Sequence, residues 1–127
     1  MASPYTEPVP RIFVYGTLLR GASNHHRMAG AAFVGAALTL PAFDLYDLGW
    51  HPAVVPGSTA ILGEVFEVGP ELLRALDAFE EHPTWFRRTP LALADGSAAE
   101  IYLYVSPLPP DARRIDHGDW ARHLRER

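Results

Sequence analysis

The sequence predicts an α+β fold: a mixed β-barrel of about five to six strands with flanking helices. Short apolar runs rich in β-branched residues recur along the 127-residue chain, and turn residues separate them. One strong helical pattern, beginning at Pro70, interrupts these runs. Because strands dominate, we expect a mixed sheet that curls toward a barrel. The length fits one domain spanning residues 1–127, with 1–10 and about 107–127 at its periphery.

The strands are predicted from apolar runs that end at glycine, proline or Asp-Gly. The first run stops at Gly16, and the second contains Gly35, which permits a β-bulge. Asp95-Gly96 lies between two apolar runs and predicts a hairpin. Asp44 and Asp47 are expected to face solvent. The predicted strands are Arg11–Tyr15, Phe33–Leu40, Phe43–Leu48, Ala53–Val55, Ile61–Val68, Arg88–Leu93 and Glu100–Ser106.

Three helices are predicted. Asn24 is suited to cap a short helix from His25 to Ala31. Proline is favoured in the first turn of a helix, so the main helix is expected to begin at Pro70 and to end before Pro83. A short basic helix is predicted over Trp120–Glu126.

The main helix carries an acid where its apolar residues lie. At about 100° per residue, with Leu72 at the origin, Leu76 lies near 40°, Glu80 near 80° and Glu81 near 180°. Glu81 is therefore expected at the surface, whereas Glu80 faces the apolar side. Burial of a carboxylate raises its pKa above the usual value of about 4.3, which suits a general acid/base. The alternative is a helix-end glutamate paired with Arg87 or Arg88.

A glycine-bracketed loop, residues 15–21, follows the first strand. Such a turn can leave backbone N–H groups free to bind a carboxylate or an oxyanion. It lacks the Gly-Lys-Ser/Thr of a phosphate-binding loop and the spacing of a dinucleotide fingerprint. The alternative is an ordinary connection between a strand and a helix.

Three segments together resemble the γ-glutamylcyclotransferase-like (AIG2-like) superfamily. They are Val14–His25, Gly63–Val68 and Leu76–Arg88, which resemble its signature loop, one of its strands and its acid-bearing helix with the exit from it. The specific part is Tyr-Gly-Thr-Leu at 15–18 combined with Leu-Asp-x-x-Glu at 76–80. The resemblance covers about residues 12–120 and is nearest to short γ-glutamylamine cyclotransferase-type members.

The resemblance implies a compact mixed β-barrel and an enzyme that cyclises a γ-glutamyl amide to 5-oxoproline, releasing an amine from a small γ-glutamyl amine or amino acid. It implies no metal and no cofactor. Glu80 matches the family's acid/base, and the substrate-binding loop corresponds to Tyr15, Gly16, Thr17 and Leu18. A family tyrosine that lines the pocket corresponds to Tyr102 or Tyr104. The loops at 48–55 and 82–86 are expected to surround the leaving amine.

The sequence departs from the family pattern at two positions near the acid. The residue after the acid is often glycine in the family, and here it is Glu81, a second carboxylate that could raise the pKa of Glu80. Phe86 stands where the family usually has tyrosine, so it cannot supply a hydroxyl to the substrate.

Two other classes of function are compatible with the sequence. One is a non-catalytic small-ligand binding module on the same fold, in which the acid at 80 holds a ligand amine. The other is a protein-interaction domain, which would need an exposed apolar patch. Trp85, Phe86 and Trp120 could contribute to such a patch.

The composition restricts the classes of partner that the protein is expected to bind. With 11 Lys plus Arg against 15 Asp plus Glu the formal net charge is −4, which argues against a nucleic-acid binder. The chain has no cysteine, and its six histidines are scattered without metal-ligand spacing. No signal peptide or membrane span is evident in the sequence. We expect a cytoplasmic protein, a monomer or homodimer, whose partner is a small γ-glutamyl molecule.

Overall fold

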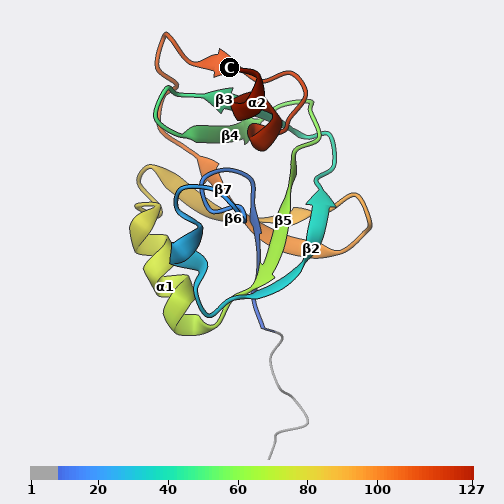
Figure 1. The fold of residues 1–127 in the computed structure, drawn as a ribbon, viewed down its shortest axis with the longest axis vertical. Coiled ribbons are helices and arrows are strands. Elements are labelled where there is room, and N and C mark those ends of the chain that lie inside the picture. Colours follow the sequence, from blue (N-terminus) through green and yellow to red (C-terminus); the bar gives the residue numbers. More distant parts are fainter. Residues whose placement is uncertain (1–8) are drawn as a thin grey trace, which may run out of the picture.

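The computed structural model describes residues 9–127, which form two twisted sheets and three short helices (Figure 1). The larger sheet has the order β2-β5-β1-β7-β6 and the smaller one β4-β3-β8. The first comprises β2 (Ala32–Leu38), β5 (Leu62–Glu67), β1 (Arg11–Val14), β7 (Ala98–Tyr104) and β6 (Phe86–Ala92). The second comprises β4 (Pro52–Pro56), β3 (Phe43–Asp47) and β8 (Arg113–Arg114).

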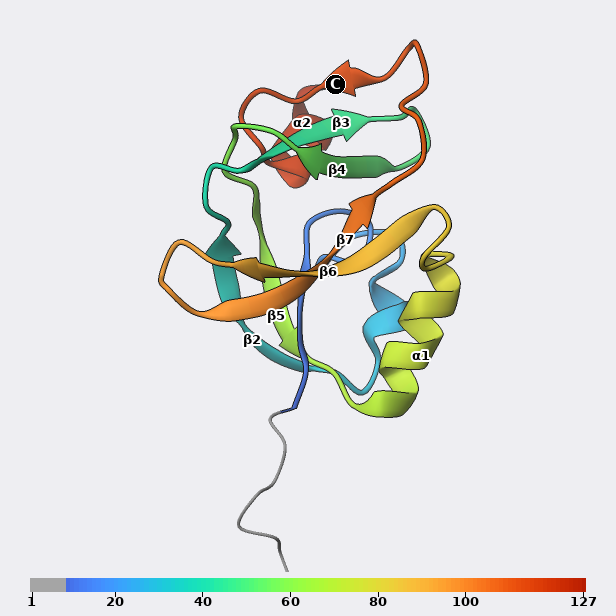
Figure 2. The same cartoon turned by 180° about the vertical axis from the view of Figure 1, so that it is seen from behind.

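The α+β class with a mixed sheet is confirmed. β1 pairs with β7 in parallel and with β5 antiparallel. The structure has eight strands among the described residues, and their pairing leaves two separate sheets without closing into a ring. Figure 2 shows from behind how the smaller sheet lies beyond one end of the larger. The predicted hairpin and bulge are present, at Gly96 (φ 87°) and between Phe33 and Gly35.

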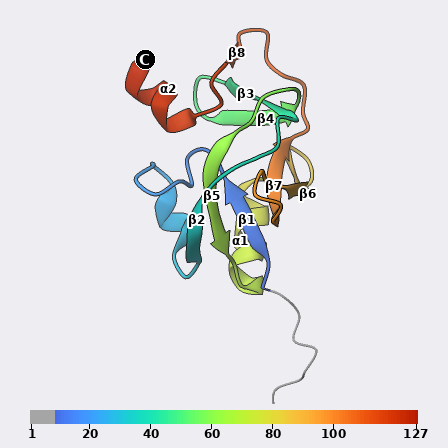
Figure 3. The same cartoon turned by 90° about the vertical axis from the view of Figure 1, so that its right-hand side faces the viewer.

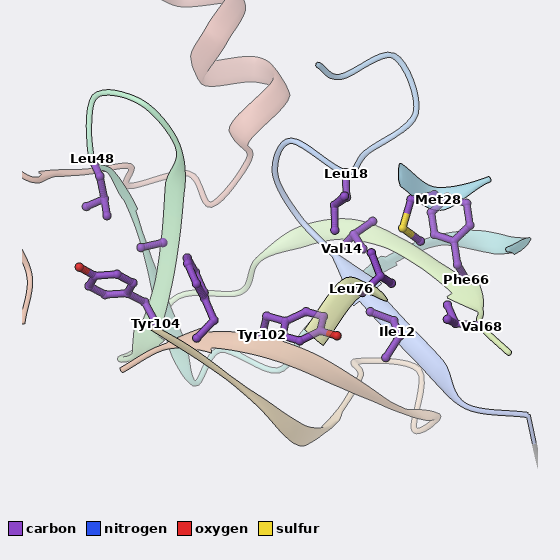
Figure 4. Packing of buried hydrophobic residues seen from close by; sticks show 12 residues of the cluster. Ile12, Val14, Leu18, Met28, Leu48, Phe66, Val68, Leu76, Tyr102 and Tyr104 are labelled. Atoms are coloured by element: carbon purple, nitrogen blue, oxygen red, sulfur yellow. The ribbon is translucent and has the colours of Figure 1, made fainter. Parts of the chain in front are cut away.

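The central strand supplies side chains to both faces of the larger sheet. Ile12 and Val14 belong to one apolar cluster and Phe13 to the other, and all three are buried. Figure 4 shows the first cluster, in which Leu76 and Tyr102 approach the side chains of β1. This double burial explains the uninterrupted apolar run in the sequence, because a strand covered on both faces shows no alternation.

Helix α1 (Pro70–Phe79) covers one face of the larger sheet beside the 3₁₀ helix η1 (His25–Met28) (Figures 1 and 2). Leu76 is its buried residue, and Pro70 occupies the first turn as predicted. The helix ends at Phe79, earlier than the position before Pro83. η1 is shorter than the predicted helix, and Asn24 makes no side-chain capping bond.

The C-terminal segment is more integrated than its sequence indicates. β8 pairs with β3, although no strand was predicted there. Ile115 and Trp120 are buried, although residues 107–127 were expected at the periphery. Helix α2 (Trp120–Glu126) lies over the smaller sheet (Figure 3). None of the helices in the described part of the chain is long and apolar enough to cross a membrane.

The prediction that Asp47 faces solvent is wrong. The residue is buried, and its carboxylate accepts hydrogen bonds from His123 (2.7 Å), Arg127 (3.0 Å) and the backbone of Gly49 (2.7 Å). Burial alone would raise the pKa of Asp47, but these partners outweigh it and hold the pKa below its usual value. The strand pattern could not show this, because His123 and Arg127 come from the far end of the chain.

Candidate active site

A cavity of about 420 Å³ opens where three connections meet: the loop after β1, the turn between β3 and β4, and the segment after α1. Six of the seven residues predicted for the site line it, namely Tyr15, Gly16, Thr17, Leu18, Glu80 and Tyr102. Trp50, His51 and Pro52, from the loop at 48–55 that was expected to surround the leaving amine, also line it, and so do Ser23 and Asn24, for which no role was predicted. The acid and the glycine-bracketed loop therefore belong to one cavity, although they lie far apart in the sequence.

Glu80 occupies the C-cap position of α1. Its backbone N–H still donates to the Leu76 carbonyl at 2.9 Å. The last turn of the helix therefore fixes the position of Glu80 in the cavity wall. Within residues 9–127 no hydrogen bond or ion pair reaches the carboxylate. Burial raises the pKa of Glu80 to about 7. An acid held near neutrality can both accept and return a proton at physiological pH.

The alternative in which Arg87 or Arg88 pairs with Glu80 is wrong. The Arg88 guanidinium instead donates to Asp77 at 2.9 Å and to Glu100 at 2.9 Å. The Tyr102 hydroxyl also donates to Asp77, at 2.6 Å. Because Asp77 and Glu100 already hold Arg88, Glu80 is left without a counter-charge, which lets burial dominate its pKa.

Glu81 is exposed, as predicted, and adopts a left-handed backbone conformation (φ 53°). That conformation favours glycine, which gives a physical reason for a glycine after the acid. Burial is the cause of the raised pKa of Glu80, and the charge of Glu81 does not contribute to the shift. The expectation that the second carboxylate raises this pKa is therefore wrong.

The carbonyls of residues 16–18 have polar partners within the protein. The Gly16 carbonyl accepts from Leu19 N–H and the Thr17 carbonyl from Asn24 N–H, while the Leu18 carbonyl lies 2.9 Å from His25 Nδ1. In the described part of the chain, the N–H groups of residues 16, 17 and 18 donate to no protein acceptor. A loop with its carbonyls satisfied and its N–H groups free is suited to a carboxylate or an oxyanion.

Gly16 is required by a close approach. A Cβ atom at this position would lie 2.3 Å from Cγ of Pro52, at the start of β4. Both residues line the cavity. The missing side chain therefore lets the loop after β1 pack directly on the smaller sheet, and this contact closes one wall of the cavity.

The two tyrosines of β7 have different surroundings. Tyr102 lines the cavity, and burial, followed by its bond to Asp77, raises its pKa. Tyr104 does not line the cavity; its hydroxyl donates to the Pro107 carbonyl at 3.2 Å, and its ring packs edge-on against Phe86. Tyr104 therefore packs against Phe86, which lines the cavity, but Tyr104 itself does not line it.

His51 carries the buried polar atom without a partner in the described residues, its Nε2. Nδ1 lies 2.7 Å from the Pro52 carbonyl, so Nδ1 holds the proton and Nε2 is left as an acceptor. Burial lowers the pKa of His51, which keeps the ring neutral. The sequence offered no signal for this role beyond the expectation that residues 48–55 border the site.

The fold and the cavity define a class of small α+β proteins in which a poorly solvated carboxylate shares a cavity with a loop whose N–H groups have no acceptor among the described residues. Residues 12–122 match the model of the family described as "Gamma-glutamyl cyclotransferase, AIG2-like". The chain belongs to this family.

Two curated relatives and one solved structure show the extent of the likeness. The Escherichia coli "Gamma-glutamylcyclotransferase family protein YtfP" is 35% identical over 87% of this chain and 95% of its own. The mouse "Gamma-glutamylaminecyclotransferase" is 41% identical, covering 75% of this chain and 76% of its own. The crystal structure of an uncharacterized protein from Pyrococcus horikoshii superposes with a TM-score of 0.79 at 29% identity, covering 92% and 94% of the two chains.

Proposed function

We propose that the protein is a γ-glutamylcyclotransferase that converts a small γ-glutamyl amine or amino acid to 5-oxoproline and a free amine, with Glu80 as its general acid/base. The observation that carries the proposal is the Glu80 carboxylate, which lacks a partner among the described residues and has a pKa raised to about 7, in the same cavity as the free N–H groups of the loop at 16–18. Membership of the family supports the reaction class.

The proposed reaction needs one acid/base, because nucleophile and electrophile belong to the same molecule. The substrate's α-ammonium gives a proton to the Glu80 carboxylate, and the resulting amine attacks the γ-carbonyl carbon. A C–N bond forms, and the carbonyl oxygen becomes an oxyanion that the N–H groups of the loop can stabilise. The protonated Glu80 then gives its proton to the departing nitrogen as the original amide bond breaks.

The proton balance closes without a further reactant. The attacking nitrogen loses two protons in becoming the lactam N–H, and the departing nitrogen gains two in leaving as an ammonium. A carboxyl group with a pKa near 7 accepts and donates with similar ease at neutral pH. Holding the glutamyl chain folded supplies proximity, which contributes up to about 7–11 kcal/mol in the best systems.

The test is formation of 5-oxoproline from a panel of γ-glutamyl amines and amino acids, followed by mass spectrometry. Glu80→Gln should reduce kcat by about 10²–10⁴-fold, the usual contribution of general acid/base catalysis. Glu71→Gln is the matched control, because this exposed glutamate of α1 lies outside the cavity. Equal turnover by wild type and Glu80→Gln would falsify the mechanism. Binding without turnover by wild type would instead identify a ligand-binding module.

A further inference from the structure

The direction of the free N–H groups in the loop at 16–18 is set by the carbonyls of the same peptide units. The C=O and N–H groups of a trans peptide lie in one plane and point in opposite directions. The cis peptide of the described chain is His82–Pro83, so the peptides of this loop are trans. A hydrogen bond to the Gly16 carbonyl therefore also fixes the direction of the Thr17 N–H, which belongs to the same unit.

Among the described residues, the Leu18 carbonyl is the one in this loop that a side chain holds. His25 Nδ1 lies 2.9 Å from it, whereas the Gly16 and Thr17 carbonyls accept backbone N–H groups. A carbonyl oxygen only accepts hydrogen bonds, so Nδ1 carries a hydrogen and is the donor. His25 therefore fixes the peptide unit that joins Leu18 to Leu19.

A continuous chain of hydrogen bonds runs from this imidazole to the cavity. The Leu19 N–H, on the peptide unit that His25 holds, donates to the Gly16 carbonyl at 3.1 Å. The Thr17 N–H, on the next unit, has no protein acceptor in the described chain, and Thr17 lines the cavity. Hydrogen bonds in such a chain polarise one another, so the donor at its start strengthens the N–H at its end.

The start of the hydrogen-bond chain is anchored in the core. The His25 ring lies 5.9 Å from the ring of Phe66, tilted by 48°. Phe66 and Met28, the last residue of η1, are buried in the same apolar cluster (Figure 4). His26 is exposed, and its side chain makes no hydrogen bond within residues 9–127. The two adjacent histidines therefore differ, because His25 is held against the loop and His26 is not.

We propose that His25 is a positioning residue for the reaction: through the two peptide units of this hydrogen-bond chain it directs and polarises the Thr17 N–H toward the oxyanion of the γ-carbonyl. This inference rests on the proposed function and adds a residue to it. Because the oxyanion forms only as the α-amine attacks, the chain stabilises the transition state and contributes little to substrate binding. The expected signature is a loss in kcat at nearly constant KM.

Two substitutions of similar size separate the hydrogen bond from the packing of the ring. Asparagine carries its Nδ2 at the same number of bonds from the backbone as His25 Nδ1, whereas leucine has a methyl group there. His25→Leu should lower kcat for 5-oxoproline formation about tenfold, less than the about 10²–10³-fold typical when an oxyanion donor is removed, because the Thr17 N–H itself remains. His25→Asn should keep kcat within about threefold of wild type, and KM should stay within about twofold in both variants.

His26→Leu is the matched control, and it should change neither constant. Equal losses of kcat in His25→Leu and His25→Asn would mean that the ring acts by packing alone, and would overturn the proposal. A wild-type kcat in His25→Leu, or a rise in KM without a change in kcat, would overturn it too. His25→Ala, which also lacks the donor, replaces His25→Leu if that variant does not fold, and the same outcomes then decide.

Amide proton chemical shifts test the hydrogen-bond chain without any substrate. The Thr17 N–H is two peptide units away from His25 along the chain, so its shift reports polarisation through the chain. Both His25→Leu and His25→Asn lack the imidazole, so its ring current is absent from both spectra. We expect the Leu19 and Thr17 amide protons to lie upfield in His25→Leu relative to His25→Asn. Equal shifts in the two variants would overturn the proposal.

The two measurements distinguish failure of this inference from failure of the proposed function. If the wild type cyclises no γ-glutamyl amide, the proposed function fails, and the amide shifts still decide whether His25 polarises the Thr17 N–H. If cyclisation occurs and His25→Leu retains the full kcat, the proposed function stands and the role assigned to His25 is wrong.

Discussion

The Tyr15 hydroxyl donates a 2.7 Å hydrogen bond to the backbone carbonyl of Tyr102, 87 residues further along the chain. This bond joins the residue just after β1 to β7 beneath the cavity that both residues line. Burial raises the pKa of Tyr15 well above its usual value, and the nearby charge of Glu80 adds to the effect. The hydroxyl therefore stays protonated and remains a donor.

Loss of this hydrogen bond should lower the stability of the fold by a measurable amount. Tyr15→Phe leaves a buried carbonyl without its donor, so we expect the free energy of unfolding to fall by about 1–2 kcal/mol in urea titrations. Tyr46→Phe is the matched control, because the Tyr46 hydroxyl makes no hydrogen bond within residues 9–127 and its ring is half-buried. Equal effects of the two substitutions would show that the bond contributes nothing specific.

Glu80 should make the protein less stable as the pH rises. Its pKa is about 7 when folded, against an ordinary value of 4.5, so the folded state binds the proton more tightly. The stabilisation is therefore complete below about pH 4.5 and is lost as the pH rises toward 7. Because the side chain is partly exposed, we expect a loss of about 1–3 kcal/mol.

The wild type and Glu80→Gln, unfolded in urea at pH 5 and pH 8, provide the comparison. Glutamine cannot ionise, so the variant should gain stability relative to wild type at pH 8. If the difference in free energy of unfolding between wild type and Glu80→Gln is the same at pH 5 and at pH 8, Glu80 titrates like an exposed acid. The same ionisation should give kcat/KM an ascending limb near pH 7.

Gly16 should be intolerant of the smallest side chain. In Gly16→Ala the added methyl would lie 2.3 Å from Pro52, so the loop or β4 must move. We expect a loss of about 1–3 kcal/mol in the free energy of unfolding, together with lower cyclisation activity. Gly35→Ala is the control, because no atom lies within 4 Å of its added methyl and its φ is not positive. Comparable losses in both variants would contradict the packing argument.

Asp47 should anchor the C-terminal helix. Asp47→Asn weakens the hydrogen bonds to His123 and Arg127, so we expect the free energy of unfolding to fall by about 2 kcal/mol at pH 7. The pKa of Asp47 is lowered in the fold, so its contribution is present above the ordinary value of 3.8 and is lost as the pH falls through the lower folded pKa.

Asp116→Asn is the comparison for Asp47, because the Asp116 side chain is 84% exposed although it pairs with Arg114. A change below about 0.5 kcal/mol is expected for such a surface pair. If the two asparagine variants unfold alike at pH 7, Asp47 does not anchor α2.

Much of the fold was predictable because the signals are local. The apolar run of β1, the Asp95-Gly96 hairpin and the helix beginning at Pro70 each depend on residues a few positions apart. The same holds for the direction of Glu80, since helical periodicity alone separates it from Glu81. Of the two tyrosines on one strand face, the pattern could not distinguish Tyr102, which lines the cavity, from Tyr104, which does not.

Sequence by itself therefore determined the class of the fold, the candidate acid and the loop opposite it, because periodicity, turn chemistry and a short motif are properties of neighbouring residues. Tertiary structure alone decided that Arg88 binds Asp77 and leaves Glu80 unpaired, that Asp47 is buried under α2, and that Nε2 of His51 is buried without a partner among the described residues. Each of these depends on contacts between distant segments, and such contacts are set by how the sheets pack.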